Sequence, residues 1–213
     1  MSREKFDWSN FETLRNDICH CLINYEDNKE RLELVPNVRV LDLAVIFYYK
    51  SGHGFNKGAI IHISNNDLKR WNISVEQLYK VAKKNTVKLL PLAFQTIERA
   101  IDDIAKEENL PSPCEGEPKE RMYVLTNEEK YLGANTILYP ETMEVVYQRL
   151  GADFFILPAS MHEVIIMPDV GNVIASKLQS LVVDMNKHFL EEDEVLSNSV
   201  YRYDTKAKKI VKM

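Results

Sequence analysis

The sequence predicts an α+β fold in which two strand–strand–helix units contribute to an antiparallel or mixed sheet that amphipathic helices cover. Short runs of β-branched and aromatic residues alternate with segments in which apolar residues recur every three or four positions. Hydrophobic residues make up 45% of the 213 residues, which is enough for a sizeable core. The same order of elements, with Gly-Ala before the second strand, starts at residue 43 and again at residue 122. This order is either an internal duplication or the ordinary order of elements in α+β proteins.

Composition favours a soluble protein. The chain has 27 basic and 32 acidic side chains and a formal net charge of −5, which argues against a general affinity for nucleic acid. The first residues lack the apolar segment of a signal peptide, and no stretch approaches the roughly 20 apolar residues of a membrane span. We therefore expect a cytoplasmic protein with no membrane partner.

The cysteines do not indicate a disulfide framework or a metal site. There are three, and only His20 separates Cys19 from Cys21. In a helix these two side chains would point about 200° apart, so they would not bind one metal together. No phosphate loop, dinucleotide fingerprint or metalloprotease helix is present, and we expect neither a metal nor a cofactor.

The first 50 residues predict a helix at 9–24, because Phe11, Leu14 and Ile18 recur at helical spacing after a capping Ser9 or Asn10. A charged segment at 25–34 predicts a second short helix or a continuation of the first. The β-branched and aromatic run from Val38 to Tyr49 predicts one strand.

Residues 58–104 predict a second strand and three helices. The strand covers 58–63, and a short helix covers 67–71. The next helix starts at Ser74, which with Gln77 forms a capping-box pattern, and ends near Asn85 and Thr86. Apolar spacing predicts a further amphipathic helix at 91–104.

Residues 107–120 predict a linker or loop, because prolines, glycine and charged residues leave almost nothing to bury there. This segment is the best internal boundary. It separates an N-terminal unit, 1–106, from a C-terminal unit, 121–213, although the two units are also compatible with one continuous domain.

The last part of the chain predicts strands at 122–125 and 133–139, a helix at 141–150 that Gly151 ends, and a long helix at 173–190. A terminal strand at 200–204 and a basic tail follow. The core face of the long helix is expected to contain six apolar residues, namely Ile174, Leu178, Leu181, Val182, Met185 and Phe189.

Between these two helices lies the stretch that predicts a candidate site. Two apolar runs, Phe154–Leu157 and Val164–Met167, are each too short for a helix and flank a turn composition that starts at Pro158. They predict a buried β-hairpin. Its connection contains Ser160, His162 and Glu163, the densest group of chemically capable side chains next to apolar strands.

Several blocks resemble a family of proteins from gut clostridia and their relatives that is known only as a domain of unknown function. The most specific block, Leu157 to Val164, reads Leu-Pro-Ala-Ser-Met-His-Glu-Val and is similar to the family pattern Leu-Pro-Ser-Ser-Ile-His-Glu-Val, with conservative departures at Ala159 and Met161. The resemblance covers nearly the whole chain, and the other blocks that carry it are Asp42-Leu-Ala-Val-Ile-Phe, Gly58-Ala, Trp71, Lys83-Lys-Asn-Thr, Leu125-Thr-Asn, Gly133-Ala and Leu138-Tyr-Pro.

Residues 138–167 also resemble a second, broader family of Firmicute proteins. Neither resemblance implies a reaction, cofactor or partner. Members of these families often occur near mobile genetic elements, which implies a role in conflict or regulation by association only.

The candidate binding residues are Ser160, His162 and Glu163 in the hairpin connection and His53 on a glycine-flanked loop. The first three are the residue types of a hydrolytic triad, but in a strand His162 and Glu163 would point to opposite faces, and no glycine-rich elbow surrounds Ser160. We therefore assign no catalytic residue. The structural alternative is that Ser160 satisfies turn amides while His162 and Glu163 bond to strand ends or a lysine.

Two functional hypotheses stay open. The first is a non-catalytic protein-interaction or regulatory module, with a protein partner rather than nucleic acid or a membrane. The second is a small hydrolase or ligand-binding enzyme that uses Ser160 and His162, with His53 or Glu163 in support. The sequence does not indicate an oligomeric state.

Overall fold

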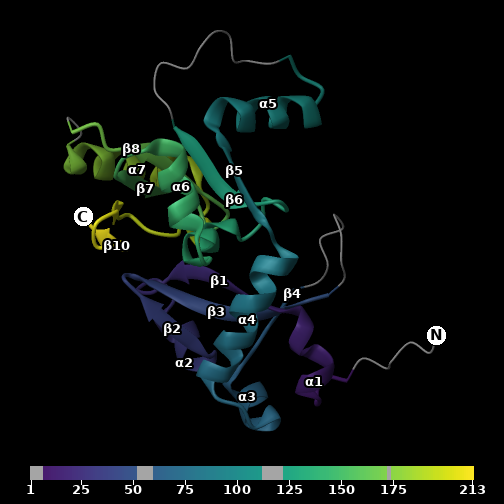
Figure 1. The fold of residues 1–213 in the computed structure, drawn as a ribbon. Helices are drawn as coiled ribbons and strands as arrows, with labels where there is room; N and C mark the ends of the chain where they lie inside the picture. Colours follow the sequence, from purple (N-terminus) through teal and green to yellow (C-terminus); the bar gives the residue numbers. More distant parts are fainter. Residues whose placement is uncertain (1–6, 52–59, 112–121, 172–173) are drawn as a thin grey trace. The chain divides into compact units, whose positions relative to one another are not determined.

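The computed structural model describes residues 7–51, 60–111, 122–171 and 174–213 (Figure 1). It confirms the α+β class. The chain forms two compact units, Met1–Pro91 and Leu92–Met213, so the division falls ahead of the 107–120 segment, most of which lies outside the described residues. Each unit has its own sheet, and the described strand pairs are antiparallel. Within the described ranges, no helix has the length and apolar character needed to cross a membrane.

The first unit is a small sheet with the strand order β1-β3-β2, in which β4 also pairs with β3. Its elements are α1 (Phe11–Leu14), the 3-10 helix η1 (Arg15–Asp17), β1 (Ile18–Asn24), α2 (Lys29–Leu34), β2 (Asn37–Val40), β3 (Leu43–Lys50), β4 (Ile60–His62), α3 (Asn65–Trp71) and α4 (Val75–Leu89).

The helix predicted at 9–24 is wrong beyond Asp17, because Ile18–Asn24 forms strand β1 and pairs along its whole length with β3. The run is buried at nearly every position, so its apolar residues fit both a helical and an extended period. As a result Cys19 and Cys21 share one face of a strand. Burial raises the pKa of both thiols to about 12, which keeps them protonated. The described residues contain no group of three or more side chains placed to hold a metal.

The single strand predicted at 38–49 is two strands. β2 and β3 form a hairpin in which Val40 lies opposite Leu43, and Leu41 adopts a φ of 59° in the tight turn. The strand predicted at 58–63 is observed as β4; Gly58 and Ala59 lie outside the described residues.

Helix α4 begins with the predicted capping box between Ser74 and Gln77 but continues three residues past Thr86. Asn85 and Thr86 do not end it because tertiary partners bind their side chains. The Asn85 amide donates to the carbonyls of Arg15 and Ile18, and the buried Thr86 hydroxyl accepts from the His20 amide. These bonds hold α4 against β1, across the sheet of the first unit (Figure 1).

The second unit is a sheet with the strand order β10-β9-β7-β8-β6-β5. Its elements are β5 (Leu92–Thr96), α5 (Ile97–Glu107), β6 (Tyr123–Asn127), the 3-10 helix η2 (Gly133–Leu138), α6 (Thr142–Leu150), β7 (Phe154–Pro158), β8 (Val164–Pro168), α7 (Ala175–Phe189), the 3-10 helix η3 (Glu192–Glu194), β9 (Tyr201–Asp204) and β10 (Lys209–Lys212). Gly151 ends α6 with a φ of 70°, as predicted.

Three predictions for this unit need correction. The helix at 91–104 is half strand: β5 pairs with β6, and Thr96 then caps α5 by accepting from the Arg99 amide. The strand at 133–139 is the 3-10 helix η2. The basic tail is an edge strand, because β10 pairs with β9.

The core face predicted for the last long helix is only partly buried. On α7, Val182 is buried and Leu178 packs beside it against Phe155, Leu157 and Val200. The other four predicted core residues, Ile174, Leu181, Met185 and Phe189, are exposed.

Candidate functional site

The predicted hairpin of β7 and β8 lies in the middle of the second sheet, with Pro158 opposite Val164 and β9 and β6 on either side. It is held from both faces. Phe155 and Leu157 contribute to the cluster under α7, and on the alternate face Phe154 stacks on Tyr203 with ring centroids 5.2 Å apart. This packing fixes the 159–163 turn that follows β7.

Ser160 is buried and closes the turn. The amides of Ala159 and Ser160 both donate to the Glu163 carbonyl at 3.2 Å, and the Ser160 hydroxyl accepts from the His162 amide at 2.9 Å. A serine that bonds the amide two residues ahead stabilises a turn.

Both ring nitrogens of His162 lie near a polar group. Its Nδ1 accepts from the Leu132 amide at 3.0 Å, and its Nε2 lies 3.7 Å from a carboxylate oxygen of Glu194. The ring stacks on Tyr131 with centroids 5.0 Å apart. Because Nδ1 accepts the hydrogen bond from the Leu132 amide, this nitrogen carries no proton and its lone pair is occupied. No hydrogen bond joins the imidazole to the Ser160 hydroxyl, so the two side chains share a turn without forming a nucleophile–base pair.

The turn rests on a second loop that sequence reasoning did not assign to the site. The Thr126 hydroxyl donates to the His162 carbonyl at 2.7 Å. Asn127, fully buried, donates to the Tyr131 carbonyl and accepts from the amides of Glu129 and Tyr131. An asparagine that bonds the amide two residues on is an Asx turn, which the Asn-Glu-Glu-Lys sequence allowed.

Gly133 allows the two loops to touch. A Cβ on this residue would lie 2.1 Å from the Thr126 hydroxyl oxygen, 2.6 Å from the His162 carbonyl oxygen and 2.7 Å from the Asn127 amide nitrogen. Only glycine leaves space for this approach.

Glu163 is half-buried beside these loops. Burial raises the pKa of its carboxyl, although the charges of His162 and Lys130 act in the opposite direction. Lys130 forms its ion pair with Glu107, at 2.8 Å. The fourth candidate, His53, lies outside the described residues.

We predict that Gly133→Ala destabilises the second unit by about 3 kcal/mol or more, because two of the three clashing atoms belong to the backbone and cannot turn away. Urea unfolding measures this. Gly151→Ala is the matched control: it places alanine at a φ of 70° in open space and should cost only about 1–2 kcal/mol. Equal losses in the two variants would contradict the close approach.

A second prediction concerns the Leu132–His162 hydrogen bond. His162→Ala should lower the free energy of unfolding by about 1–3 kcal/mol, because it leaves the Leu132 amide without its acceptor. His162→Asn should recover part of this loss, since the Asn side-chain oxygen can take the place of Nδ1. Hydrogen exchange of the Leu132 amide reports the bond directly. If this amide exchanges as slowly in His162→Ala as in the unmodified protein, the bond does not hold the loop.

The third prediction concerns pH. A carboxyl whose pKa is higher in the folded chain binds more protons there, so stability falls as the pH rises from the ordinary value of 4.5 through the raised value of Glu163. In Glu163→Gln this loss is removed, and the variant should gain stability relative to the unmodified protein over that window. Urea unfolding across the pH range measures it, with the exposed Glu128→Gln as control. If the difference in stability between Glu163→Gln and the unmodified protein does not change with pH, the pKa of Glu163 is not raised.

The comparisons with curated proteins and with solved structures found no match. A family model described as a family of unknown function, DUF5688, matches residues 2–205, which is nearly the whole chain. The protein therefore belongs to the DUF5688 family.

Proposed function

We propose that this protein is a non-catalytic interaction module that binds a helix of a protein partner through apolar residues on α7. The proposal rests on one observation. The exposed fraction is 53% for Ile174, 52% for Leu181, 46% for Met185 and 74% for Phe189. We call these four residues, of which Ile174 is the N-cap residue of α7, the α7 stripe. Contiguous apolar surface that a fold leaves exposed is typical of sites that bind another protein.

The spacing of the α7 stripe suits a partner helix. Leu181, Met185 and Phe189 follow one another at four-residue intervals along α7, so they lie on one side of the helix, and Ile174 is its N-cap residue. Leu178, on the same helix, packs against the buried cluster, so the stripe lies next to an existing core. With 15 residues, α7 is about 22 Å long and can accommodate a partner helix of several turns.

The orientation of α7 on its unit is fixed by a polar anchor as well as by Val182. The buried Asn186 side chain donates to the Ser197 carbonyl at 3.0 Å and to the side-chain oxygen of Asn198 at 2.9 Å. These bonds hold the C-terminal half of the helix against the segment that enters β9. The α7 stripe is therefore presented by a helix that is held in place.

The bonds of the 159–163 turn support this proposal over the hydrolase alternative. A Ser–His pair needs an imidazole nitrogen free to take the hydroxyl proton. Here Nδ1 of His162 accepts from Leu132, and the Ser160 hydroxyl is buried and accepts from the His162 amide. We therefore assign partner contact to the α7 stripe and a structural role to the turn. A cytoplasmic location and a regulatory role are part of the proposal, and they rest on composition and on the family resemblance.

We predict that replacing Leu181 and Met185 together by Asp abolishes partner binding, because two carboxylates cannot be buried in an apolar helix contact. Both side chains are exposed, so the free energy of unfolding should change by about 1 kcal/mol or less. Gln179→Asp, an exposed polar position on another face of α7, is the matched control.

The measurement is affinity capture from the native host with the unmodified protein, the double variant and the control, followed by binding with purified components. A photo-crosslinking amino acid in place of Met185 identifies the contacting segment. The proposal requires one protein that the unmodified chain and Gln179→Asp retain, that the double variant loses, and that cross-links through an amphipathic helix. Retention by the double variant, or cross-links only to a second copy of this chain, would refute it.

A further inference from the structure

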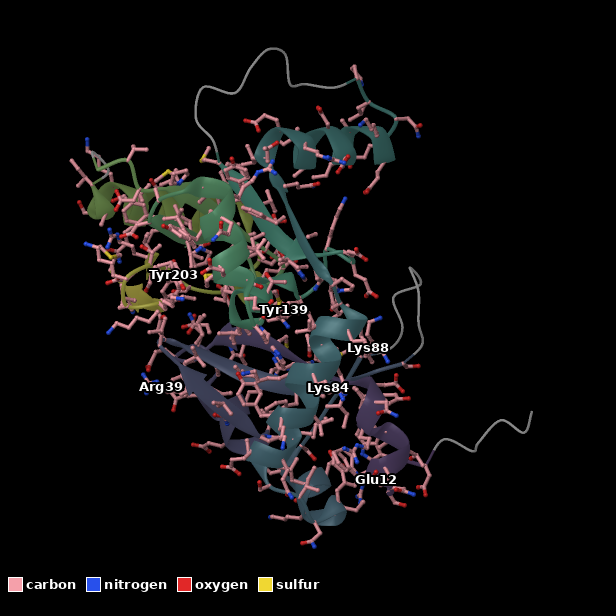
Figure 2. All side chains as sticks on the ribbon, in the orientation of Figure 1. Glu12, Arg39, Lys84, Lys88, Tyr139 and Tyr203 are labelled. Atoms are coloured by element: carbon pink, nitrogen blue, oxygen red, sulfur yellow. The ribbon has the colours of Figure 1, made fainter. Side chains whose placement is uncertain are left out.

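A cavity of about 480 Å³ lies in the second unit, between the η2–α6 junction and the β9–β10 hairpin. Its volume lies within the range of about 300–1,000 Å³ that is usual for small-molecule sites. None of Ser160, His162 and Glu163 lines it, and the α7 stripe is not part of it either. Tyr139, at the η2–α6 junction, and Tyr203, on β9, both contribute to its wall and are labelled in Figure 2.

The inner wall of the cavity is aromatic and apolar. Tyr139 and Tyr203 are buried, and Ile210 on β10 is half-buried. The Tyr203 ring stacks on Phe154 at an interplanar angle of 27°, so one wall is fixed by the core. Burial, with smaller contributions from Glu144 and Asp204, raises the pKa of Tyr203, which keeps its phenol neutral.

The rim of the cavity has charges of both signs. Lys208 and Lys209 lie on the hairpin side, and Glu141 and Glu144 lie at the start of α6. Glu144 accepts from the Gln148 side chain at 2.7 Å. Across the described part of the chain, no ion pair involves Lys208, Lys209 or Glu141. The opposite charges of the rim therefore do not neutralise each other by direct contact.

We propose that this cavity binds a small zwitterion with an apolar body, namely a free apolar amino acid or a short peptide. Its carboxylate binds Lys208 and Lys209, its ammonium group binds Glu141, and its side chain lies against Tyr139 and Tyr203. The apolar wall buries the side chain of the ligand. The unpaired positive and negative charges of the rim are complementary to the carboxylate and the ammonium group of the ligand. This site is independent of the proposed partner surface.

Isothermal titration of the full chain with phenylalanine tests the charge requirement. Two analogues are matched to it: 3-phenylpropanoate lacks the ammonium group, and phenethylamine lacks the carboxylate. We expect saturable binding of phenylalanine and at least about tenfold weaker binding of each analogue. Absence of saturable binding of both phenylalanine and the Phe-Phe dipeptide, or equal affinity for an analogue, would overturn the proposal.

Amino-acid substitutions test whether phenylalanine binds in this cavity. Replacing Lys208 and Lys209 together by Gln should weaken phenylalanine binding by about tenfold or more. Ile210→Trp should abolish it by filling the cavity, and urea unfolding checks that this variant still folds. Lys187→Gln on α7 is the control and should bind like the unmodified protein. Unchanged binding in the double variant, or equal weakening in Lys187→Gln, would overturn the assignment.

Discussion

The contact between the 126–133 loop and the 159–163 turn fixes the hairpin at the centre of the second unit. Gly133 approaches the backbone of the turn so closely that no side chain fits between them. That approach accompanies two bonds, from the Leu132 amide to the His162 ring and from the Thr126 hydroxyl to the His162 carbonyl. Each bond satisfies a polar group that would otherwise be buried without a partner, which is costly. The side chains of Ser160 and His162 therefore help to hold the hairpin turn in place.

Because Ser160 and His162 already form these bonds, both of our proposals concern other surfaces of the second unit. A catalytic serine and histidine must be free to exchange a proton, whereas Ser160 and His162 both accept hydrogen bonds from backbone amides. In contrast, the side chains of the α7 stripe are exposed, and Lys208, Lys209 and Glu141 on the rim of the cavity form no ion pair within the described residues. An apolar stripe favours association with another apolar surface, and unpaired rim charges favour a charged small molecule.

Local signals predicted the elements that local chemistry determines. The capping box of Ser74, the C-cap at Gly151 and the hairpin around Pro158 depend on near neighbours, and all three are observed. The strands β1 and β5 were mistaken for helix because their apolar runs fit either period, and pairing with β3 and β6 decides between them. The site could be predicted only in part: Ser160 and His162 share a turn, but the contacts of Leu132 and Thr126 with His162 span 30 and 36 residues.

The same reasoning explains why the prediction for α7 was half right. Six apolar residues at helical spacing predict one broad buried face. Leu178 and Val182 pack against the sheet. The Asn186 side chain donates to the Ser197 carbonyl, and this bond fixes the rotation of the helix about its own axis. A helix fixed in this way cannot also bury Leu181 and Met185 against the same strands. The apolar face is therefore wider than the surface that its own unit offers, and the exposed part is left for a partner helix to cover.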